Sequence, residues 1–524
     1  MKKQTARAKS RKLPQGKSWW RQWLVSRRFR IRRYQAALMI IFGTIAIFSY
    51  LTNPFVRFSI VKDPFTEIQL ADGQFEISPQ IGLLLRDGSF VRQLGFIKAS
   101  WHILTGKVSG GQKAPAGTVE QIIANIHKLR FNPEEPFLIS GDHFSVFYPR
   151  SLGIFYHSLM DPRIKLSEED WKNRQLLYLK STAYALEVFS QANRLATTVV
   201  PIGPKSVVLI NVSAPPSDTL YSILYALAVM EDSSEIITRY PYGDLSLTEA
   251  TNQLQTQEAA HKLVQLYHDD LLKQWQQFEL EVYDPVSGLI KRNILLSGVK
   301  DMAKHQSGFY DNVIYWKTNQ LAQQLGIISR DEQFLVDLKQ RILTNFWYEQ
   351  DGHFIEDLSE ESMLNNLYSS DWIVAYQLGF LSPDNPLDRP YLVKSVQYIQ
   401  RNAIDQPFGL QYHPDQRPYQ LYWWVGFFAP DYGSSAIWSN LGQEYIKLLV
   451  HLYQATGDTS YLDRAEKQLE AYTFNIKRYR GYPEVYSSQG DFFRQSLYKS
   501  VRQTGWVVSF EQARAMYQWT KNNQ

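Results

Sequence analysis

The acidic side chains best suited to chemistry stand in two short segments rich in aromatic residues. In KHQSGFYDNVIYW, Asp311 lies between Tyr310 and Asn312. In RGYPEVYSSQGDF, Glu484 lies two residues before Tyr486. Glycoside hydrolysis needs one protonated carboxyl group at the leaving oxygen and one carboxylate that activates water or attacks the anomeric carbon. Packing against aromatic rings disfavours the ionised form of a carboxyl group, so either segment can supply the protonated member.

Each of the two carboxyl groups also has a purely structural interpretation. Asp311 begins a helix-like run, where an aspartate commonly acts as an N-cap, and the two roles can coincide. Glu484 lies in an expected loop, where a charged side chain is ordinarily solvated. The residues alone leave both interpretations open.

Aromatic residues make up 14% of the chain, and many gather between residues 412 and 438. Flat apolar rings fit the C–H-rich faces of sugars. We therefore predict Trp424 and Trp438 as stacking platforms, and Tyr310 and Tyr486 as further substrate contacts, with core packing as the alternative for each ring. The cluster comprises Tyr412, Tyr419, Tyr422, Trp423, Trp424, Phe427, Phe428, Tyr432 and Trp438.

A third segment, SGDHFSVFYPR, places two charged side chains in an aromatic stretch. Asp142 is predicted to contact the substrate. Arg150 is predicted to bind sugar hydroxyls or to hold a neighbouring carboxylate, because a guanidinium group can donate several hydrogen bonds at once. A structural ion pair is the alternative for Arg150.

Several other chemistries are disfavoured by what the sequence lacks. The chain has no Cys, which excludes disulfides, thiolate metal sites and cysteine nucleophiles. Its ten His form no H-E-x-x-H or H-x-H pair, and neither G-x-x-x-x-G-K-[ST] nor G-x-S-x-G occurs. We therefore expect no metal and no cofactor.

The first 51 residues predict a membrane anchor. Residues 1–33 hold 13 Lys and Arg and no acidic residue, which leaves the body mildly acidic and disfavours nucleic-acid binding. Residues 34–51, YQAALMIIFGTIAIFSYL, are uncharged and span roughly 27 Å as a helix, close to the bilayer hydrocarbon thickness. A buried core helix and a cleaved signal peptide are the alternatives. An uncleaved anchor would hold the basic tail in the cytoplasm and the body outside it, so a lipid bilayer is a predicted partner at the cell membrane.

The remaining chain divides into two parts. Residues 52–117 mix short extended runs with Asp-Gly and Gly-Gly turns, which predicts a stalk or small β-containing cap. Residues 118–524 show mainly helical periodicity, with helical stretches that begin at Thr118 and Asn440, a C-cap at Gly457, and one candidate strand in PKSVVLINVS. Long helices joined by long aromatic loops favour a mainly α (α/α)6 toroid whose loops at one mouth carry function, and a plain helical bundle is the alternative.

The order and the residues of these motifs resemble those of the (α/α)6-barrel glycosidases, particularly glycoside hydrolase families 63 (processing α-glucosidases) and 37 (trehalases). Residues 306–312, QSGFYDN, resemble the E-S-G-W-D-N segment of those families, with one extra residue and Gln in place of Glu. Residues 484–486, EVY, match their late E-x-Y segment. Residues 435–440, SAIWSN, keep the Trp and Asn of their G-P-x-W-x-N segment, and FYPRSLGIFY takes the place of their aromatic pocket loop. The resemblance covers about residues 135–520.

The resemblance implies an inverting hydrolase for an α-glucoside or a related oligosaccharide. Asp311 would be the general acid and Glu484 the general base, with the two carboxyl groups roughly 6.5–9.5 Å apart. A non-catalytic glycan-binding protein on the same scaffold remains an alternative. A polysaccharide lyase is a weaker one, because an acidic body repels a polyanionic substrate. The oligomeric state is not predicted.

Overall fold

The chain divides into two compact units, residues 1–55 and residues 56–524. The predicted basic tail and membrane anchor, residues 1–51, lie outside the described residues, and no described helix is long and apolar enough to cross a bilayer. The computed structural model describes the strands at 57–60, 69–71, 74–76 and 84–86, and residues 110–141, 146–203, 206–211, 215–243, 254–296, 298–299, 304–414, 429, 431–495 and 498–523.

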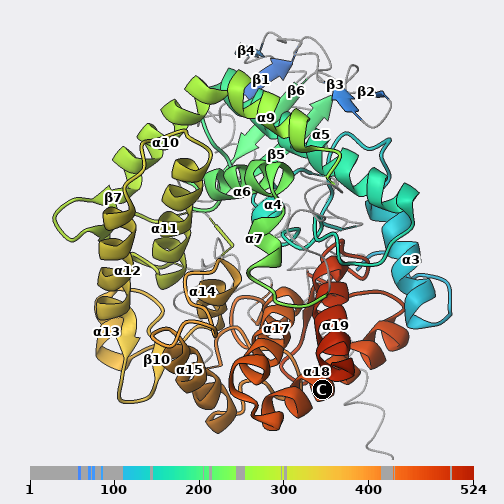
Figure 1. Ribbon diagram of the computed structural model, residues 1–524, viewed down its shortest axis with the longest axis vertical. Coiled ribbons are helices and arrows are strands. Elements are labelled where there is room, and N and C mark those ends of the chain that lie inside the picture. Colours follow the sequence, from blue (N-terminus) through green and yellow to red (C-terminus); the bar gives the residue numbers. More distant parts are fainter. Residues whose placement is uncertain are drawn as a thin grey trace, which may run out of the picture. The chain divides into compact units, whose positions relative to one another are not determined.

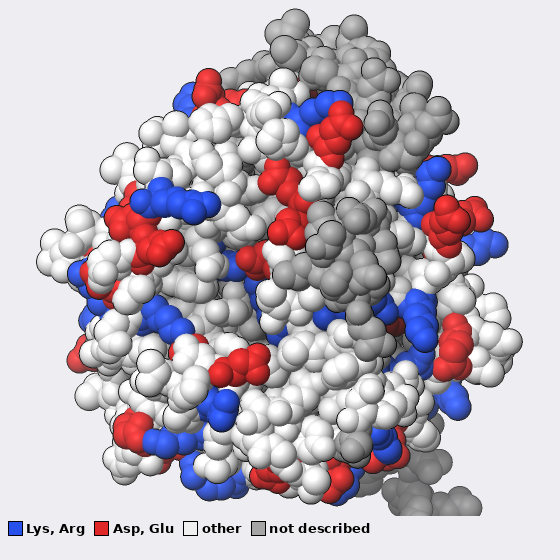
Figure 2. All heavy atoms as spheres, in the orientation of Figure 1, with Lys and Arg blue, Asp and Glu red and all other residues white. Residues whose placement is uncertain are grey.

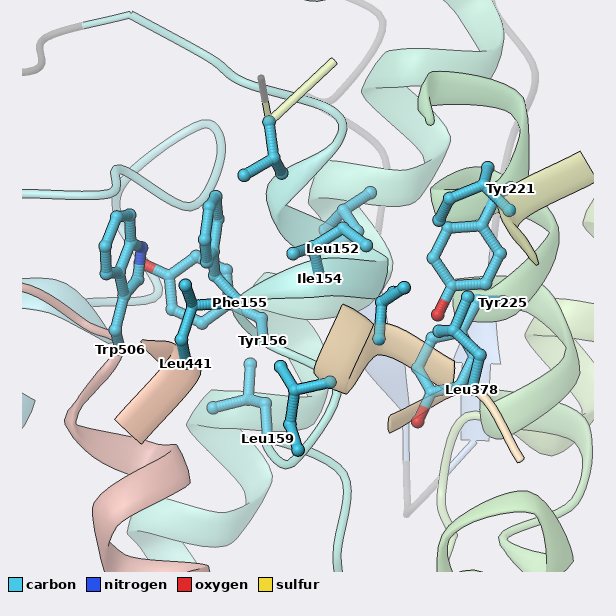
Figure 3. Close-up of a cluster of buried hydrophobic side chains, with 14 of the residues drawn as sticks. Leu152, Ile154, Phe155, Tyr156, Leu159, Tyr221, Tyr225, Leu378, Leu441 and Trp506 are labelled. Carbon is cyan, nitrogen blue, oxygen red and sulfur yellow. The ribbon is translucent and has the colours of Figure 1, made fainter. Parts of the chain in front are cut away.

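Within these described residues, six helical elements of the second unit form an inner ring (Figure 1). Each contacts the next one in chain order. The ring closes where Phe155, after the first element, stacks on Trp506, before the last, with ring centroids 4.0 Å apart (Figure 3). The elements are α4 (Ser151–Ile154), α6 (Thr219–Glu231), α11 (Phe309–Gln324), α14 (Val374–Gln377), α17 (Ser439–Thr456) and α19 (Val507–Asn522).

A second set of helices lies outside this ring and alternates with it along the chain (Figure 1). This alternation agrees with the predicted toroid of helical hairpins. The outer helices are α3 (Val119–Arg130), α5 (Glu168–Ala192), α9 (Gln257–Leu266), α10 (His268–Val282), α12 (Glu332–Phe346), α15 (Arg389–Arg401) and α18 (Thr459–Tyr479). The shorter elements are α7 (Ser234–Ile237), α13 (Glu360–Asn365) and the 3-10 helix η1 (Ser370–Ile373).

The burial pattern explains which helices lie inside. Helix α17 is buried continuously from Ser439 to Leu452, as expected for a helix surrounded by protein. Helix α18 buries only one stripe and exposes the rest of its surface, as expected for an amphipathic outer helix. The predicted C-cap Gly457 ends α17 with φ 73°, and the predicted start Thr118 caps α3 by accepting from the backbone N–H of Gln121.

A four-stranded antiparallel sheet of order β4-β1-β6-β5 joins the segment before residue 110 to the helical part. Strand β6 confirms the strand predicted in PKSVVLINVS. Strand β1, from the segment predicted as a stalk, pairs directly with β6. The sheet comprises β1 (Arg57–Ile60), β4 (Leu84–Arg86), β5 (Thr198–Gly203) and β6 (Ser206–Ile210), and β2 (Gln69–Ala71) pairs with β3 (Gln74–Glu76).

Between successive inner helices the chain forms one outer helix, or the pair α9 and α10. Short strand pairs fix the loops between helices, and one of them, β11 with β12, holds the residue after Glu484 beside the start of α17. These pairs are β7 (Tyr283–Asp284) with β8 (Leu289–Ile290), β9 (Trp347–Tyr348) with β10 (His353–Phe354), and β11 (Ile437–Trp438) with β12 (Val485–Tyr486).

Candidate active site

Asp311 lies in the first turn of α11, buried beside a histidine. Its side chain is 1% exposed, and His305 Nε2 lies 2.8 Å from Asp311 Oδ2. The N-cap of α11 is Gly308, so Asp311 does not cap the helix, and that alternative is wrong. A Cβ atom on Gly308 would stand 2.7 Å from Asp311 Oδ2. The glycine of the motif therefore makes room for the carboxyl group.

Asn312, the last residue of the same motif, holds the turn that presents Asp311. Its Oδ1 accepts from the Ile290 N–H at 2.9 Å, and its Nδ2 donates to the Gly308 carbonyl at 2.8 Å. The same amide donates to Ser307 Oγ at 3.2 Å, and Ser307 has the left-handed φ of 50° that non-glycine residues rarely adopt. Asn312 thus stabilises a strained turn directly before the acid.

A second buried carboxyl group, Asp218, lies beside this turn and was not predicted. It directly precedes α6, is 0% exposed, and its Oδ2 accepts from the Val299 N–H at 2.8 Å and from the Tyr310 hydroxyl at 3.0 Å. Its Oδ1 has no hydrogen-bond partner among the described residues. Burial raises the pKa of Asp218 to about 6 against the opposing charge of Arg150, and the charge of Asp311 adds to the rise. The sequence signal was Ser217-Asp218-Thr219 before an apolar run, which is typical of an N-cap, yet this side chain caps nothing.

Arg150 and Tyr310, both predicted to contact the substrate, are directed toward Asp218. The Arg150 guanidinium, at the start of α4, donates to the Gly298 carbonyl, and its charge lowers the pKa of Asp218. A Cβ atom on Gly298 would stand 3.1 Å from Asp218 Oδ2. Whether Arg150 binds sugar hydroxyls or holds a carboxylate stays a prediction. The extra residue of the motif, Tyr310, supplies a hydrogen bond to the same group.

Glu484 is held by two phenols in a separate cluster. It is 2% exposed, and it accepts from the Tyr432 hydroxyl at Oε1 (2.8 Å) and from the Tyr498 hydroxyl at Oε2 (2.6 Å). Its backbone carbonyl accepts from the N–H and Oγ of Ser439, the first residue of α17. Burial and then the charge of Glu484 raise the pKa of Tyr498, so this phenol stays a donor. The interpretation of Glu484 as a solvated surface charge is wrong.

The aromatic residues predicted around Glu484 have different surroundings. Trp438 is 5% exposed and donates from Nε1 to the Tyr432 carbonyl at 2.9 Å, which places the phenol that binds Glu484. Tyr486 is buried against Phe408, with ring centroids 4.9 Å apart. The platform role of Trp438 and the substrate contact of Tyr486 stay predictions. Asp142 and Trp424 lie outside the described residues.

The Asp311 and Glu484 clusters are connected through the segment before α14. The Glu356 carbonyl accepts from the Phe309 N–H at 2.9 Å, and its carboxyl group lies 3.4 Å from His413 Nε2. Tyr412, the neighbour of His413, packs on Trp438 with ring centroids 5.6 Å apart. The segments that precede α11, α14 and α17 therefore contact one another in turn, and they connect the Asp311 cluster to the Glu484 cluster. Neither Glu356 nor His305 was predicted, because a single buried His or Glu carries no spacing signal.

An open cavity of about 720 Å³ is lined in part by His305, which contacts Asp311. Side chains of both signs line it, including Arg292 and Lys304 as well as Glu360 and Glu361. Figure 2 likewise shows basic and acidic side chains interspersed over the described part of the visible face. A neutral, hydroxyl-rich ligand suits such a mixed lining better than a polyanion.

Comparisons with known proteins give a likeness in fold. The chain matches no protein-family profile and no curated protein. A rhamnosidase from Klebsiella oxytoca with rhamnose bound is 15% identical, with a TM-score of 0.45, over 79% of this chain and 67% of that one. A GH63 mannosylglycerate hydrolase from Thermus thermophilus is 11% identical, with a TM-score of 0.44, over 76% and 99%. A cellobiose 2-epimerase from Bacillus thermoamylovorans is 10% identical, with a TM-score of 0.48, over 77% and 99%.

Proposed function

We propose that this protein is a glycoside hydrolase that acts on a neutral glycan, an α-glucoside or a related oligosaccharide. The observation that carries the proposal is the pair of buried carboxyl groups, Asp311 and Glu484, in segments that lead into inner helices. Their surroundings differ. Asp311 stands beside a histidine and a second carboxyl group, whereas Glu484 receives two phenolic hydrogen bonds. An acid and a base need such unlike environments.

The proposed reaction is a single displacement with inversion. Asp311 gives its proton to the glycosidic oxygen as the bond to the anomeric carbon breaks. Glu484 takes a proton from the water that attacks the opposite face of that carbon. The two phenols on Glu484 fix the carboxylate toward the water, and Gly308 gives Asp311 room to meet the leaving oxygen. We place the leaving group in the cavity that His305 lines.

The experiment is hydrolysis of a panel of α- and β-linked neutral disaccharides and the matching glycosyl fluorides by the full chain. Asp311→Asn should lose on the order of 10³-fold or more on disaccharides and far less on a fluoride, which leaves without a proton. Glu484→Gln should lose activity on both. Binding of panel sugars without any turnover would instead indicate a glycan-binding protein.

The stereochemistry of the reaction tests the mechanism separately. Proton NMR of the first product anomer should show inversion, and a crystal structure should place the two carboxyl groups roughly 6.5–9.5 Å apart. Retention, or a separation near 5 Å, would contradict the single displacement. The membrane anchor at residues 34–51 and an extracytoplasmic body belong to the same proposal. They are tested by membrane fractionation of the full chain and of a chain that begins at residue 52.

A further inference from the structure

We propose that Asp218 is a positioning residue that keeps the proton on Asp311. The inference rests on the proposed function, because it assigns Asp218 a role in the acid step of that reaction. Asp218 reaches the acid site from another helix, since it directly precedes α6 whereas Asp311 belongs to α11. The Tyr310 hydroxyl, one residue before Asp311, donates to Asp218 Oδ2 at 3.0 Å.

The contacts of Asp218 do not fit a helix cap. It occupies the N-cap position of α6, but its side chain accepts no helix N–H. Its Oδ2 is used by Val299 and Tyr310, and its Oδ1 has no partner among the described residues. A buried carboxyl group with an unused oxygen costs free energy that an ordinary cap would not. The arrangement therefore suggests a function other than capping.

The charges around the two carboxyl groups give the direction of the effect. The charged or titratable groups that interact with Asp218 are Arg150 from α4, and Tyr310 and Asp311 from α11. Burial, then the charges of Asp218 and Asp311, raise the pKa of Tyr310, so the phenol remains a donor. A carboxyl group with a pKa of about 6 is mostly ionised at pH 7. Its negative charge disfavours a second negative charge on Asp311 and so favours the protonated acid. His305, whose Nε2 lies 2.8 Å from Asp311 Oδ2, is the other titratable group that faces Asp311, and a protonated His305 would act in the opposite direction.

The first test is the pH dependence of kcat/KM for the panel substrate that is hydrolysed fastest. A general acid must be protonated, so activity falls as pH rises through the pKa of Asp311. Asp218→Asn removes the neighbouring charge and should move this basic limb to lower pH, by on the order of one unit. Tyr310→Phe should move it the same way by less, because loss of the hydrogen bond raises the pKa of Asp218. A basic limb that stays in place in both variants would overturn the proposal.

A matched control is Asp405→Asn. Asp405 is also buried, and its Oδ2 also accepts from a tyrosine, the Tyr445 hydroxyl at 3.0 Å, and in addition from Arg464 Nη1 at 2.5 Å. It follows α15, and these two partners belong to α17 and α18. Its substitution should alter stability and leave the basic limb unmoved. An equal shift in Asp405→Asn would show a general effect of lost charge and would overturn the proposal.

A second readout does not need activity. Infrared difference spectra between wild type and Asp311→Asn isolate the carbonyl stretch of protonated Asp311. That band should persist at neutral pH, and in the Asp218→Asn background it should titrate at lower pH. If the band shifts while no panel sugar is hydrolysed, the proposed function fails and the coupling of the two carboxyl groups stands. If the band is unchanged by Asp218→Asn, the coupling fails whatever the activity.

Discussion

The buried carboxyl groups fall into two sets, which differ in whether their hydrogen-bond partners are neutral or positively charged. Asp218, which precedes an inner helix, has two neutral donors, and burial raises its pKa. Asp161, which follows α4, binds the Arg163 guanidinium at both oxygens and also accepts from the Tyr242 hydroxyl. Burial opposes ionisation of Asp161 as well, but the charge of Arg163 and these bonds hold its pKa below the usual value.

Glu444, inside α17, repeats the pattern of Asp161. Its Oε1 lies 2.6 Å from Lys447 Nζ and 3.1 Å from His157 Nε2, and its Oε2 accepts from the Tyr240 hydroxyl. Burial is again outweighed by the charges of Lys447 and His157, so the pKa of Glu444 is far below its usual range. Basic partners therefore hold Asp161 and Glu444 as ions. The cluster at the starts of α6 and α11 contains Asp218, a carboxyl group able to hold a proton near neutral pH. Such a perturbed pKa is more typical of a reactive site than of a structural ion cluster.

The largest expected effect separates the two glutamates. Glu484→Gln should lower kcat by several orders of magnitude with an almost unchanged melting temperature, because it removes the base but keeps a side chain that the two phenols can contact. Glu444→Gln should instead cost about 3–5 kcal/mol of folding free energy, because it leaves Lys447 buried without its counter-ion. Kinetics and denaturant unfolding of both variants measure this. If Glu484→Gln and Glu444→Gln lost equal activity at an equal folded fraction, the assignment of a catalytic role to Glu484 and a structural role to Glu444 would be wrong.

The next effect is opposite changes of stability with pH. The pKa of Asp161 is lower in the folded protein than the unfolded value of about 3.9. Ionised Asp161 therefore stabilises the fold above that pH, and this stabilisation is lost as the pH falls. Asp161→Asn should accordingly lower the free energy of unfolding at pH 7. The folded pKa of Asp218 is raised to about 6, so its ionisation lowers stability as pH rises from about 4 through 6. Asp218→Asn should therefore be more stable than wild type at pH 8, by roughly 1–3 kcal/mol. Denaturant unfolding at pH 4 and pH 8 checks both signs. Destabilisation by Asp218→Asn at pH 8 would place Asp218 with the structural ions.

The smallest expected effect compares two glycines at opposite ends of α11. Gly308→Ala would bring a methyl group within 2.7 Å of Asp311 Oδ2 and should cost about 10²-fold in kcat, because displacing a catalytic group by about 1 Å has that effect. Gly326 follows the helix with φ 70°, and nothing lies within 4 Å of a Cβ atom there. Gly326→Ala should cost about 1 kcal/mol of stability through backbone strain and leave kcat unchanged. An unchanged kcat in Gly308→Ala would show that the close approach of residue 308 to Asp311 does not matter for catalysis.

Part of the fold and of the candidate site could be predicted from local sequence patterns. Helix α17 and its Gly457 cap, helix α3 with Thr118, and strand β6 follow from periodicity and capping residues, which act over a few positions of the chain. The two carboxyl-bearing segments were recognisable because each motif is contiguous. Strand β1 could not be matched to β6, because partners about 150 residues apart leave no local signal.

The sequence by itself determined the alternation of helices, the absence of cysteine chemistry, and the identity of the two acidic segments, because composition and short-range spacing specify these. Only the tertiary structure decided which side chains surround each acid. Asp218 and Arg150 reach the Asp311 turn from other helices, and Tyr432 and Tyr498 reach Glu484 from other loops. The physical reason is that a pKa depends on burial and on charges within a few ångströms, and the closed ring of helices fixes those distances.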